Sequence, residues 1–503
     1  MELRRFPLGE YCKLLDGLGL LSGPLLSGPA PDRTVELVSC DSREVVPGTL
    51  FICKGAHFKP EFLAEAQRRG AFAYVAERVC PGIKLPCVLV RDMRQAMARL
   101  AVKYYNDPSR RLKVIGITGT KGKSTTAYYL KDILDRYLAP KRCGVISSIG
   151  TYDGVEEFES HLTTPEPLEL QKRFANALSA GLEYVVMEVS SQALKYHRTL
   201  GTRFAAAAFL NIGTDHISPI EHPDFEDYFH SKLKLFAQAD FSCVNLDGGH
   251  AREALEAARA ACPTVFTFSR RDPAANVYGR DVRKVGGDIL FQADGARLGG
   301  SYRLTMPGLF NVDNALAAIG LCQGLGLPPE PVREGLAAAR APGRMEVYTS
   351  GDGEVAAIVD YAHNRMSFGA LFRSAREEYP GRRIVAVFGC PGKKAFDRRR
   401  DLGEVAGEYS DLVILTEEDS GEEDTLSICG EIAAHVACRC RIEPNRGEAI
   451  RQAVLSCDRP SVLLITGKGA ETRQKRGLEY VDTPSDVDYV RAFLREYDAR
   501  RGR

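Results

Sequence analysis

The sequence contains no tryptophan, no internal repeat and no excess of charge of one sign. Its 67 lysines and arginines almost balance its 66 aspartates and glutamates, which leaves a formal net charge of +1. Proteins that coat nucleic acid usually carry a clear basic surplus. We therefore expect no nucleic-acid partner, although a local basic pocket could still hold a small anionic substrate.

Long hydrophobic runs and paired cysteines are also missing. Residues 1–11 are charged and no apolar run of signal-peptide length follows them, and glycines and prolines interrupt residues 14–31 before they could span a bilayer. The 14 cysteines include no Cys-x-x-Cys pair, which disfavours a zinc ribbon and a disulfide scaffold. We expect reduced cysteines, no membrane insertion and a cytoplasmic location.

The length of 503 residues predicts about three domains of the usual size. Apolar, strand-like runs alternate with amphipathic helical stretches, which is typical of α/β architecture with largely parallel sheets. Turn-forming residues at 106–109 and 341–344 suggest boundaries. The expected domains are residues 1–106, 107–340 and 341–503. In the last domain, strands are expected at 384–389, 412–416 and 462–467, each ending in a loop that could bind ligand.

The sharpest local signal is Thr118-Gly-Thr-Lys-Gly-Lys-Ser-Thr125, which stands between a predicted strand and a predicted helix. This context is typical of a phosphate loop, in which backbone N–H groups, the final lysine and a following hydroxyl surround phosphates and Mg²⁺. Ile117 stands where the common pattern has its first glycine. A glycine-rich turn without nucleotide is the alternative. The predicted ATP-binding residues of this loop are Gly119, Thr120, Lys121, Gly122, Lys123, Ser124 and Thr125.

This form of the loop resembles the Mur ligases and their folate-ligase relatives, and further motifs follow in order. They are Thr163-Thr-Pro, Met187-Glu-Val-Ser-Ser, Asn211-Ile-Gly-Thr-Asp-His, Lys232, Gly308-Leu-Phe-Asn-Val-Asp-Asn, Gly343-Arg-Met-Glu, Asp360-Tyr-Ala-His and Gly467-Lys-Gly. Asp41-Ser-Arg and Pro47-Gly-Thr-Leu-Phe resemble the branch of UDP-N-acetylmuramoyl-tripeptide synthetases. The resemblance covers nearly the whole chain.

The resemblance implies three domains: an N-terminal domain that binds the UDP-sugar, a central P-loop-type parallel-sheet domain that binds ATP, and a C-terminal Rossmann-like domain that binds the amino acid. It implies a monomeric ligase that uses ATP and Mg²⁺ to add a diamino acid to UDP-N-acetylmuramoyl-L-alanyl-D-glutamate through an acyl phosphate. Three alternatives remain: a divergent Mur-like ligase with another acceptor, a folylpolyglutamate-type ligase, and a non-catalytic nucleotide-binding paralogue.

By the same resemblance, the catalytic residues are Lys123, Glu188, His216 and Lys232, and the Mg²⁺ ligands are Ser124, Glu188, His216 and a carbamylated Lys232. Lys234 is the alternative for the modified lysine. For Glu188, a salt-bridged strand end is the alternative. Without the resemblance, His216 would be interpreted as a loop histidine and Lys232 as a solvated helix lysine.

Further positions are assigned by resemblance to the nucleotide and to the UDP-sugar. Asn311 and Asn314 would lie near the base, and Arg344 and Asp360 near the phosphates and ribose. Expected UDP-sugar contacts are Ser42, Thr163, Thr164, Ser190 and Arg198, whereas Tyr196 stands where relatives often have glutamine. Thr163 and Thr164 could instead cap a helix beginning near Pro167.

The incoming amino acid is expected to meet Arg399, Gly467 and Glu471. Ligases that add meso-diaminopimelate carry an arginine where this chain has Gly421, so that clamp is missing. The nearby carboxylates Glu418, Asp419, Glu422 and Glu423 favour a cationic side chain, and we expect L-lysine or ornithine. A merely solvated acidic loop is the alternative.

Overall fold

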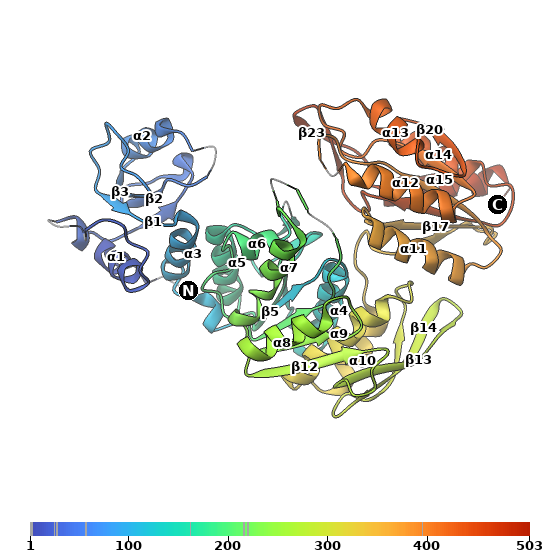
Figure 1. Ribbon diagram of the computed structural model, residues 1–503, viewed down its shortest axis with the longest axis horizontal. Coiled ribbons are helices and arrows are strands. Elements are labelled where there is room, and N and C mark those ends of the chain that lie inside the picture. The colour runs from blue at the N-terminus through green and yellow to red at the C-terminus, as the bar shows by residue number, and fades with distance from the viewer. Residues whose placement is uncertain are drawn as a thin grey trace.

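The computed structural model describes residues 4–24, 26, 29–55, 58–160, 162–214, 217–218, 221–394 and 396–502. Three large sheets follow one another along the chain (Figure 1). Each sheet lies within one of the three expected domains, and the boundaries between those domains stay predictions. All 14 cysteines are free thiols. Among the described residues, no helix is both long and apolar enough to cross a membrane.

The N-terminal sheet has four parallel strands in chain order. They are β1 (Leu37–Ser39), β2 (Thr49–Ile52), β3 (Ala71–Ala76) and β4 (Cys87–Leu89). Alternate residues of β2 and β3 pack against α1 (Leu8–Gly17) and α3 (Met93–Tyr104) on one face and against α2 (Pro60–Arg68) on the other. Helix α3 lies between this sheet and the rest of the chain (Figure 1).

The middle sheet has eleven strands in the order β15-β14-β13-β12-β11-β10-β5-β9-β6-β7-β8. Its parallel centre consists of β5 (Lys113–Thr118), β6 (Gly144–Ile146), β9 (Tyr184–Glu188), β10 (Ala206–Phe209), β11 (Phe241–Asn245), β12 (Thr264–Ser269) and β13 (Val277–Val285). Antiparallel strands extend both edges. They are β7 (Gly150–Tyr152), β8 (Glu157–Glu159), β14 (Asp288–Gly295) and β15 (Gly300–Leu304).

Helices cover the middle sheet and explain its apolar strands, because a strand that is buried on both faces shows no polar alternation. Helix α9 (Asn311–Leu325) is buried on nearly every side and packs between α4 (Lys123–Leu138) and the sheet. The other helices here are α5 (Pro167–Ser179), α6 (Ser191–Lys195), α7 (Phe225–Leu233), α8 (Ala251–Ala261) and α10 (Pro329–Ala338).

The C-terminal sheet has the order β16-β17-β21-β18-β19-β20, and only β16 runs antiparallel. Its strands are β16 (Glu346–Thr349), β17 (Val355–Asp360), β18 (Arg383–Phe388), β19 (Leu412–Leu415), β20 (Arg439–Ile442) and β21 (Ser461–Thr466). One face packs against α11 (Arg365–Glu378), α12 (Asp397–Tyr409) and α13 (Thr425–Ala433), and the other against α14 (Arg446–Leu455) and α15 (Asp486–Arg500). This layering confirms the expected Rossmann-like domain, and β18, β19 and β21 confirm its three expected strands.

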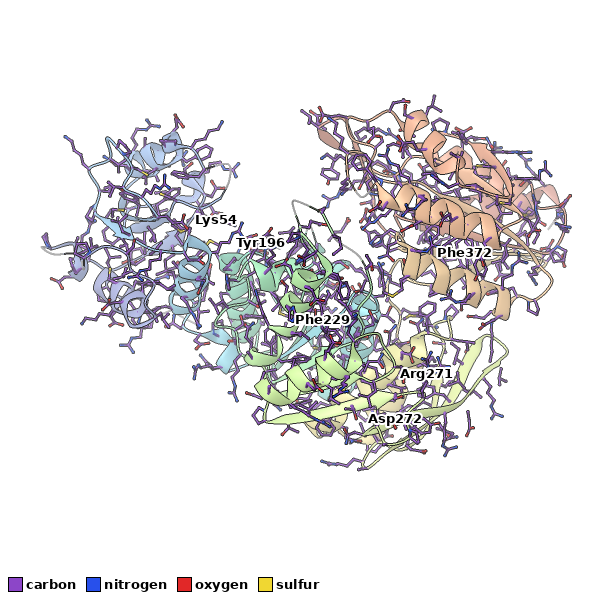
Figure 2. The ribbon with its side chains drawn as sticks, viewed as in Figure 1. Lys54, Tyr196, Phe229, Arg271, Asp272 and Phe372 are labelled. Atoms are coloured by element: carbon purple, nitrogen blue, oxygen red, sulfur yellow. The ribbon has the colours of Figure 1, made fainter. Side chains whose placement is uncertain are left out.

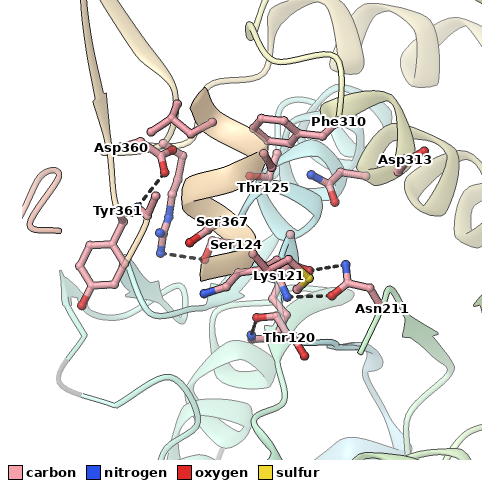
Figure 3. A pocket seen from close by; sticks show the side chains of 18 of the residues that line it. Thr120, Lys121, Ser124, Thr125, Asn211, Phe310, Asp313, Asp360, Tyr361 and Ser367 are labelled. Carbon is pink, nitrogen blue, oxygen red and sulfur yellow. Dashed lines mark hydrogen bonds between the residues drawn. The ribbon is translucent and has the colours of Figure 1, made fainter. Parts of the chain in front are cut away.

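The C-terminal sheet meets the middle sheet beside the strand ends that carry the predicted motifs. Glu378 at the end of α11 makes an ion pair with Lys284 of β13 at 2.8 Å and accepts the N–H of Gly308 at 3.0 Å. These contacts hold the two α/β units together. The carboxyl ends of β5 and β9 therefore lie close to the carboxyl end of β17 (Figure 3).

Candidate functional site

A cavity of about 720 Å³ lies at the carboxyl ends of these strands (Figure 3). The middle unit contributes the phosphate loop, Ser148, Thr163, Glu188 and Asn211, and the C-terminal unit contributes Arg344, Asp360, Tyr361 and His363. Its volume lies within the range of small-molecule sites. Two separately folded sheets therefore share one binding site.

The phosphate loop is held in shape by its glycine and its lysine. Gly122 has φ of 86°, and a Cβ atom there would lie 2.2 Å from Oδ1 of Asn314. Only glycine fits this combination of left-handed backbone and close approach. The Lys123 ammonium donates hydrogen bonds to the carbonyl oxygens of Gly119 at 2.9 Å and Thr120 at 3.2 Å. The Lys123 ammonium thus lies against the loop, at the position where a phosphate would need it.

Asn211, which lies just after β10, braces the loop. It begins one of the sequence motifs, but no role in the site was assigned to it. Its Oδ1 accepts the N–H of Lys121 at 2.9 Å, and its Nδ2 donates to the Lys121 carbonyl at 3.0 Å. The hydroxyl of Thr120 lies 3.0 Å from the hydroxyl of Tyr228 and accepts the N–H of Gly213 at 3.1 Å. The loop is therefore pre-organised by neighbouring side chains.

A hydrogen-bonded chain of oxygen atoms leads from the loop to Glu188. The hydroxyls of Ser124 and Ser148 lie 3.1 Å apart, and Oε1 of Glu188 accepts both the N–H of Ser148 at 2.9 Å and its hydroxyl at 3.1 Å. Glu188 is buried at the end of β9 and makes no ion pair within the described residues. Hard oxygen ligands of this kind suit Mg²⁺, so Ser124 and Glu188 fit the predicted metal site.

Lys232 is the largest departure from what composition alone predicts, because it is only 2% exposed. Its ammonium lies 3.0 Å from the carbonyl oxygen of Gly119, to which it donates, and 4.6 Å from the centre of the Tyr228 ring. The interpretation as a solvated helix lysine is therefore wrong. Lys234 is exposed and lines a different cavity, so Lys232 is the residue next to the phosphate loop. His216 lies outside the described residues.

Arg344 connects the two units across the cavity. Its guanidinium donates to the hydroxyls of Ser124 at 3.3 Å and Ser148 at 3.4 Å, and lies 4.5 Å from the centre of the Tyr361 ring. Asp360 accepts the N–H of Met345 at 2.9 Å, and burial raises the pKa of its carboxyl. Both predicted residues thus reach the cavity.

The two predicted asparagines have different roles. Asn314 lines the cavity, whereas Asn311 is fully buried and does not occur among the described cavity-lining residues. Asn311 donates to the Pro307 carbonyl at 2.6 Å and accepts from Nδ2 of Asn314 at 2.9 Å. It therefore orients Asn314.

Several cavity residues were not foreseen. Arg270 and Arg271 follow β12, and Asp313 lies in the first turn of α9. Burial raises the pKa of Asp313 to about 6, although its carboxylate lies 3.9 Å from Arg270. A position directly after a parallel strand is the signal that could have found the arginines.

Three of the expected UDP-sugar residues form a hydrogen-bonded framework beside the cavity. The hydroxyl of Thr164 donates to the Glu188 carbonyl at 2.9 Å and accepts the N–H of Ser190 at 3.0 Å. Ser190 in turn caps α6, and Arg198 donates to the Thr164 carbonyl at 3.1 Å. Thr163 lines the cavity itself. Neither threonine caps α5, whose N-cap is Glu166, so that alternative is wrong.

Ser42, the remaining UDP-sugar candidate, lies in the N-terminal unit. Its hydroxyl donates to Glu65 at 2.8 Å, and the side chain is buried. Nearby, Lys54 makes an ion pair with Glu166, and Arg94 lies 3.9 Å from the centre of the Tyr196 ring. Lys54 and Tyr196 mark this junction in Figure 2. These contacts join the N-terminal sheet to the middle unit, and the role of Ser42 stays a prediction.

A smaller cavity of about 40 Å³ extends the site toward the C-terminal unit and shares Ser148, Arg344 and Tyr361 with the larger one. Glu471 lines it, as do Glu159 and Lys468, which were not foreseen. The Lys468 ammonium lies 2.5 Å from Glu471 and 3.0 Å from Asp419. Glu471, which is expected to meet the incoming amino acid, thus lies on a path from the nucleotide cavity.

Gly467 and Gly421 both occupy left-handed backbone positions, with φ of 104° and 58°. A Cβ atom at Gly467 would lie 2.0 Å from Oε2 of Glu418. Residue 467 must therefore be glycine for the buried carboxyl group of Glu418 to fit. A left-handed position also disfavours an arginine at Gly421.

Most carboxylates of the acidic loop make ion pairs, although Glu422 is exposed. Glu422 contacts Lys393 at 2.9 Å, and Glu423 binds Arg399 at 2.8 Å. Arg399 also binds Glu431 at 2.8 Å and does not occur among the described cavity-lining residues. Glu418 is buried, and burial raises its pKa to about 7. The predicted contact of Arg399 with the amino acid would require these carboxylates to move.

Comparison with known proteins agrees with this geometry. Residues 117–322 match the model of the Mur ligase middle domain, and residues 343–469 match that of the Mur ligase, glutamate ligase domain. A UDP-N-acetylmuramoyl-L-alanyl-D-glutamate--L-lysine ligase of Streptococcus thermophilus is 38% identical over 469 residues, covering 92% of this chain and 93% of the relative. A UDP-N-acetylmuramyl-tripeptide synthetase of Lactobacillus acidophilus is 38% identical over 494 residues, covering 93% and 94%.

Solved structures show the same fold at lower identity. A UDP-N-acetylmuramoyl-L-alanyl-D-glutamate--2,6-diaminopimelate ligase has a TM-score of 0.68 at 23% identity, covering 99% of this chain and all of that chain. A MurF ligase from Thermotoga maritima in complex with ADP has a TM-score of 0.64 at 17% identity, covering 93% and 99%.

Proposed function

Since this chain belongs to the Mur ligase family, we propose that it joins L-lysine to UDP-N-acetylmuramoyl-L-alanyl-D-glutamate with hydrolysis of ATP to ADP and phosphate. The observation that carries the proposal is the cavity in which Lys123, Ser124 and Glu188 face Arg344 and Asp360. The reaction supplies peptidoglycan precursors, and we place it in the cytoplasm.

The first step transfers a phosphoryl group. An oxygen of the substrate's terminal carboxylate attacks the γ-phosphorus, the bond to ADP breaks, and an acyl phosphate forms. The phosphate loop holds the nucleotide through its backbone N–H groups, and the cations Lys123 and Arg344 offset the charge on the transferred group. Positioning and charge neutralisation are the main protein contributions to such transfers.

Mg²⁺, held by Ser124 and Glu188, would neutralise phosphate charge during this step. In the second step, the amine of the incoming amino acid attacks the acyl carbon, phosphate leaves, and the nitrogen gives up a proton. Glu471 lies in the smaller cavity beside this path and can bind an ammonium group of the amino acid. Closure of the cavity by both units excludes water from the acyl phosphate.

L-Lysine is the proposed acceptor for two reasons. Relatives at 38% identity over more than nine-tenths of the chain carry that specificity in their names, and the left-handed Gly421 leaves no arginine for a second carboxylate. The acidic loop contributes less than its composition predicts, because Glu422 and Glu423 are already paired. Glu159 in the smaller cavity makes no ion pair within the described residues and is better placed for a cation, whereas Glu471 would have to exchange Lys468 for it.

The test is release of ADP and formation of the UDP-linked tripeptide, with UDP-N-acetylmuramoyl-L-alanyl-D-glutamate and L-lysine, L-ornithine or meso-diaminopimelate. We expect L-lysine to give the largest kcat/KM. Lys123→Ala should abolish turnover while the fold is retained, whereas Lys141→Ala, an exposed lysine after α4, should not. A preference for meso-diaminopimelate contradicts the lysine assignment, and full turnover by Lys123→Ala contradicts the ligase mechanism.

A further inference from the structure

A second large cavity, of about 670 Å³, lies at the opposite end of the middle sheet. Its lining comes from the segments that precede β5, β10 and β11, whereas the nucleotide cavity lies where β5 and β10 end. Arg99 of α3 adds a side chain from the N-terminal unit. The two cavities are therefore separate, and the ligase reaction proposed above makes no use of the second.

The lining of this cavity is strongly basic. It includes Arg99, Arg110, Arg203 and Lys234, and among its described lining residues Asp240 is the one carboxylate. Arg203 is paired with Asp240 at 2.7 Å, and Arg110 with Asp107 at 2.7 Å. Within the described part of the chain, Arg99 and Lys234 make no ion pair. Together, these four cations and the carboxylates of Asp240 and Asp107 leave a local charge of +2.

One further feature distinguishes this cavity from a solvated basic surface. Arg99 is half-buried, and a Cβ atom at Gly201, where φ is 93°, would lie 3.0 Å from Nη1 of Arg99. The guanidinium thus lies against the backbone of a residue whose conformation favours glycine. It is therefore held beside the cavity wall and not free in solvent.

We infer that this cavity binds a small phosphate monoester, with Arg99 and Lys234 on the phosphate. A phosphate monoester carries a charge close to −2 at neutral pH, which matches the local charge of +2. Guanidinium and ammonium groups are the usual phosphate ligands. The volume, which is within the range of small-molecule sites, exceeds what a phosphate group alone would fill.

The test is direct binding to the full-length protein with its nucleotide site filled by a non-hydrolysable ATP analogue and Mg²⁺. Ribose 5-phosphate, inorganic phosphate and ribose are titrated calorimetrically at constant ionic strength, because screening weakens exposed charges. We expect ribose 5-phosphate to bind more tightly than inorganic phosphate, and ribose not to bind.

Arg99→Gln and Lys234→Gln should each weaken the binding of ribose 5-phosphate by about tenfold or more, since each removes a charged contact. The controls Lys13→Gln and Arg252→Gln each make the same single charge change at exposed positions of α1 and α8 and should leave binding unchanged.

Three results would overturn the inference: affinity equal in the cavity variants and the controls, displacement of ribose 5-phosphate by the ATP analogue, or equal affinity for inorganic phosphate. Should Arg99→Gln fail to fold by circular dichroism, Lys234→Gln decides, because that side chain is exposed. The measurement is of binding, so its outcome is independent of whether the chain adds L-lysine.

Discussion

At the scale of single residues, Lys232 carries the most specific chemistry. A buried ammonium beside the Gly119 carbonyl is costly unless it has a function or a partner, and carbamylation would convert it into an anionic metal ligand. We predict that Lys232→Ala lowers turnover by about a hundredfold and that added formate or bicarbonate partly restores it. The same anions should not restore the turnover of Lys123→Ala, because that variant lacks a cation and not an anion. The modification would be ruled out if the unsubstituted protein carried no carbamate in its mass spectrum and was nevertheless fully active.

Glu418 predicts a dependence of stability on pH. Its pKa is raised from an ordinary 4.5 to about 7 by burial. Between these two pH values, the folded state holds a proton that the unfolded state has lost. Stability is therefore highest below the unfolded pKa and falls as pH rises toward 7. We expect Glu418→Gln to be more stable than the unmodified protein at pH 8, by up to about 3 kcal/mol, and equally stable at pH 4. Urea unfolding at the two pH values measures this, and a constant difference would contradict the assignment.

The residue-scale predictions did not foresee side chains that have partners in distant segments, and the ligand contacts of these residues stay predictions. Arg399 is bound by Glu423 and Glu431, and Thr164 is occupied by backbone groups of β9 and α6. No local spacing in the sequence indicates such partners. The phosphate loop was predictable because its chemistry lies within eight consecutive residues, whereas Asn211 and Arg270 enter the site only through the order of the strands.

At the scale of elements, the turn between β5 and α4 depends on Gly122. We predict that Gly122→Ala weakens ATP binding by at least about tenfold and lowers stability by more than about 2 kcal/mol, because it adds a contact with Asn314 to the backbone strain. Gly181→Ala is a matched control: its φ is 75°, but no atom lies within 4 Å of the added Cβ. It should cost only about 1 kcal/mol and leave ATP binding unchanged. Equal effects of the two substitutions would show that strain alone matters.

The parallel strands of the middle and C-terminal sheets were predictable because continuous apolar runs report burial on two faces. The antiparallel additions β14 and β15 were not, since β13, β14 and β15 alternate in exposure and such a pattern does not reveal which sheet a strand joins. The order β17-β21-β18 likewise depends on crossover connections, which no local pattern specifies.

At the scale of the whole molecule, Arg344 tests whether the two units act as one site. Arg344→Gln removes a charge that reaches both Ser124 and Ser148, and we expect turnover to fall about a hundredfold and the thermal stabilisation by an ATP analogue to shrink. Arg340→Gln, an exposed arginine just before the linker, is the control. Unchanged stabilisation by the analogue in Arg344→Gln would show that the middle unit binds nucleotide alone.

Because two sheets share the cavity, the site is complete only in those molecules in which the two units are in contact. Arg344 stands only a few residues after α10, so the chain itself tethers it to the phosphate loop at an effective concentration on the order of millimolar, as for short linkers in general. Assembly of the site is then a unimolecular event whose equilibrium does not change with dilution. An enzyme present at a few copies per cell would keep its two halves together as well as an abundant one.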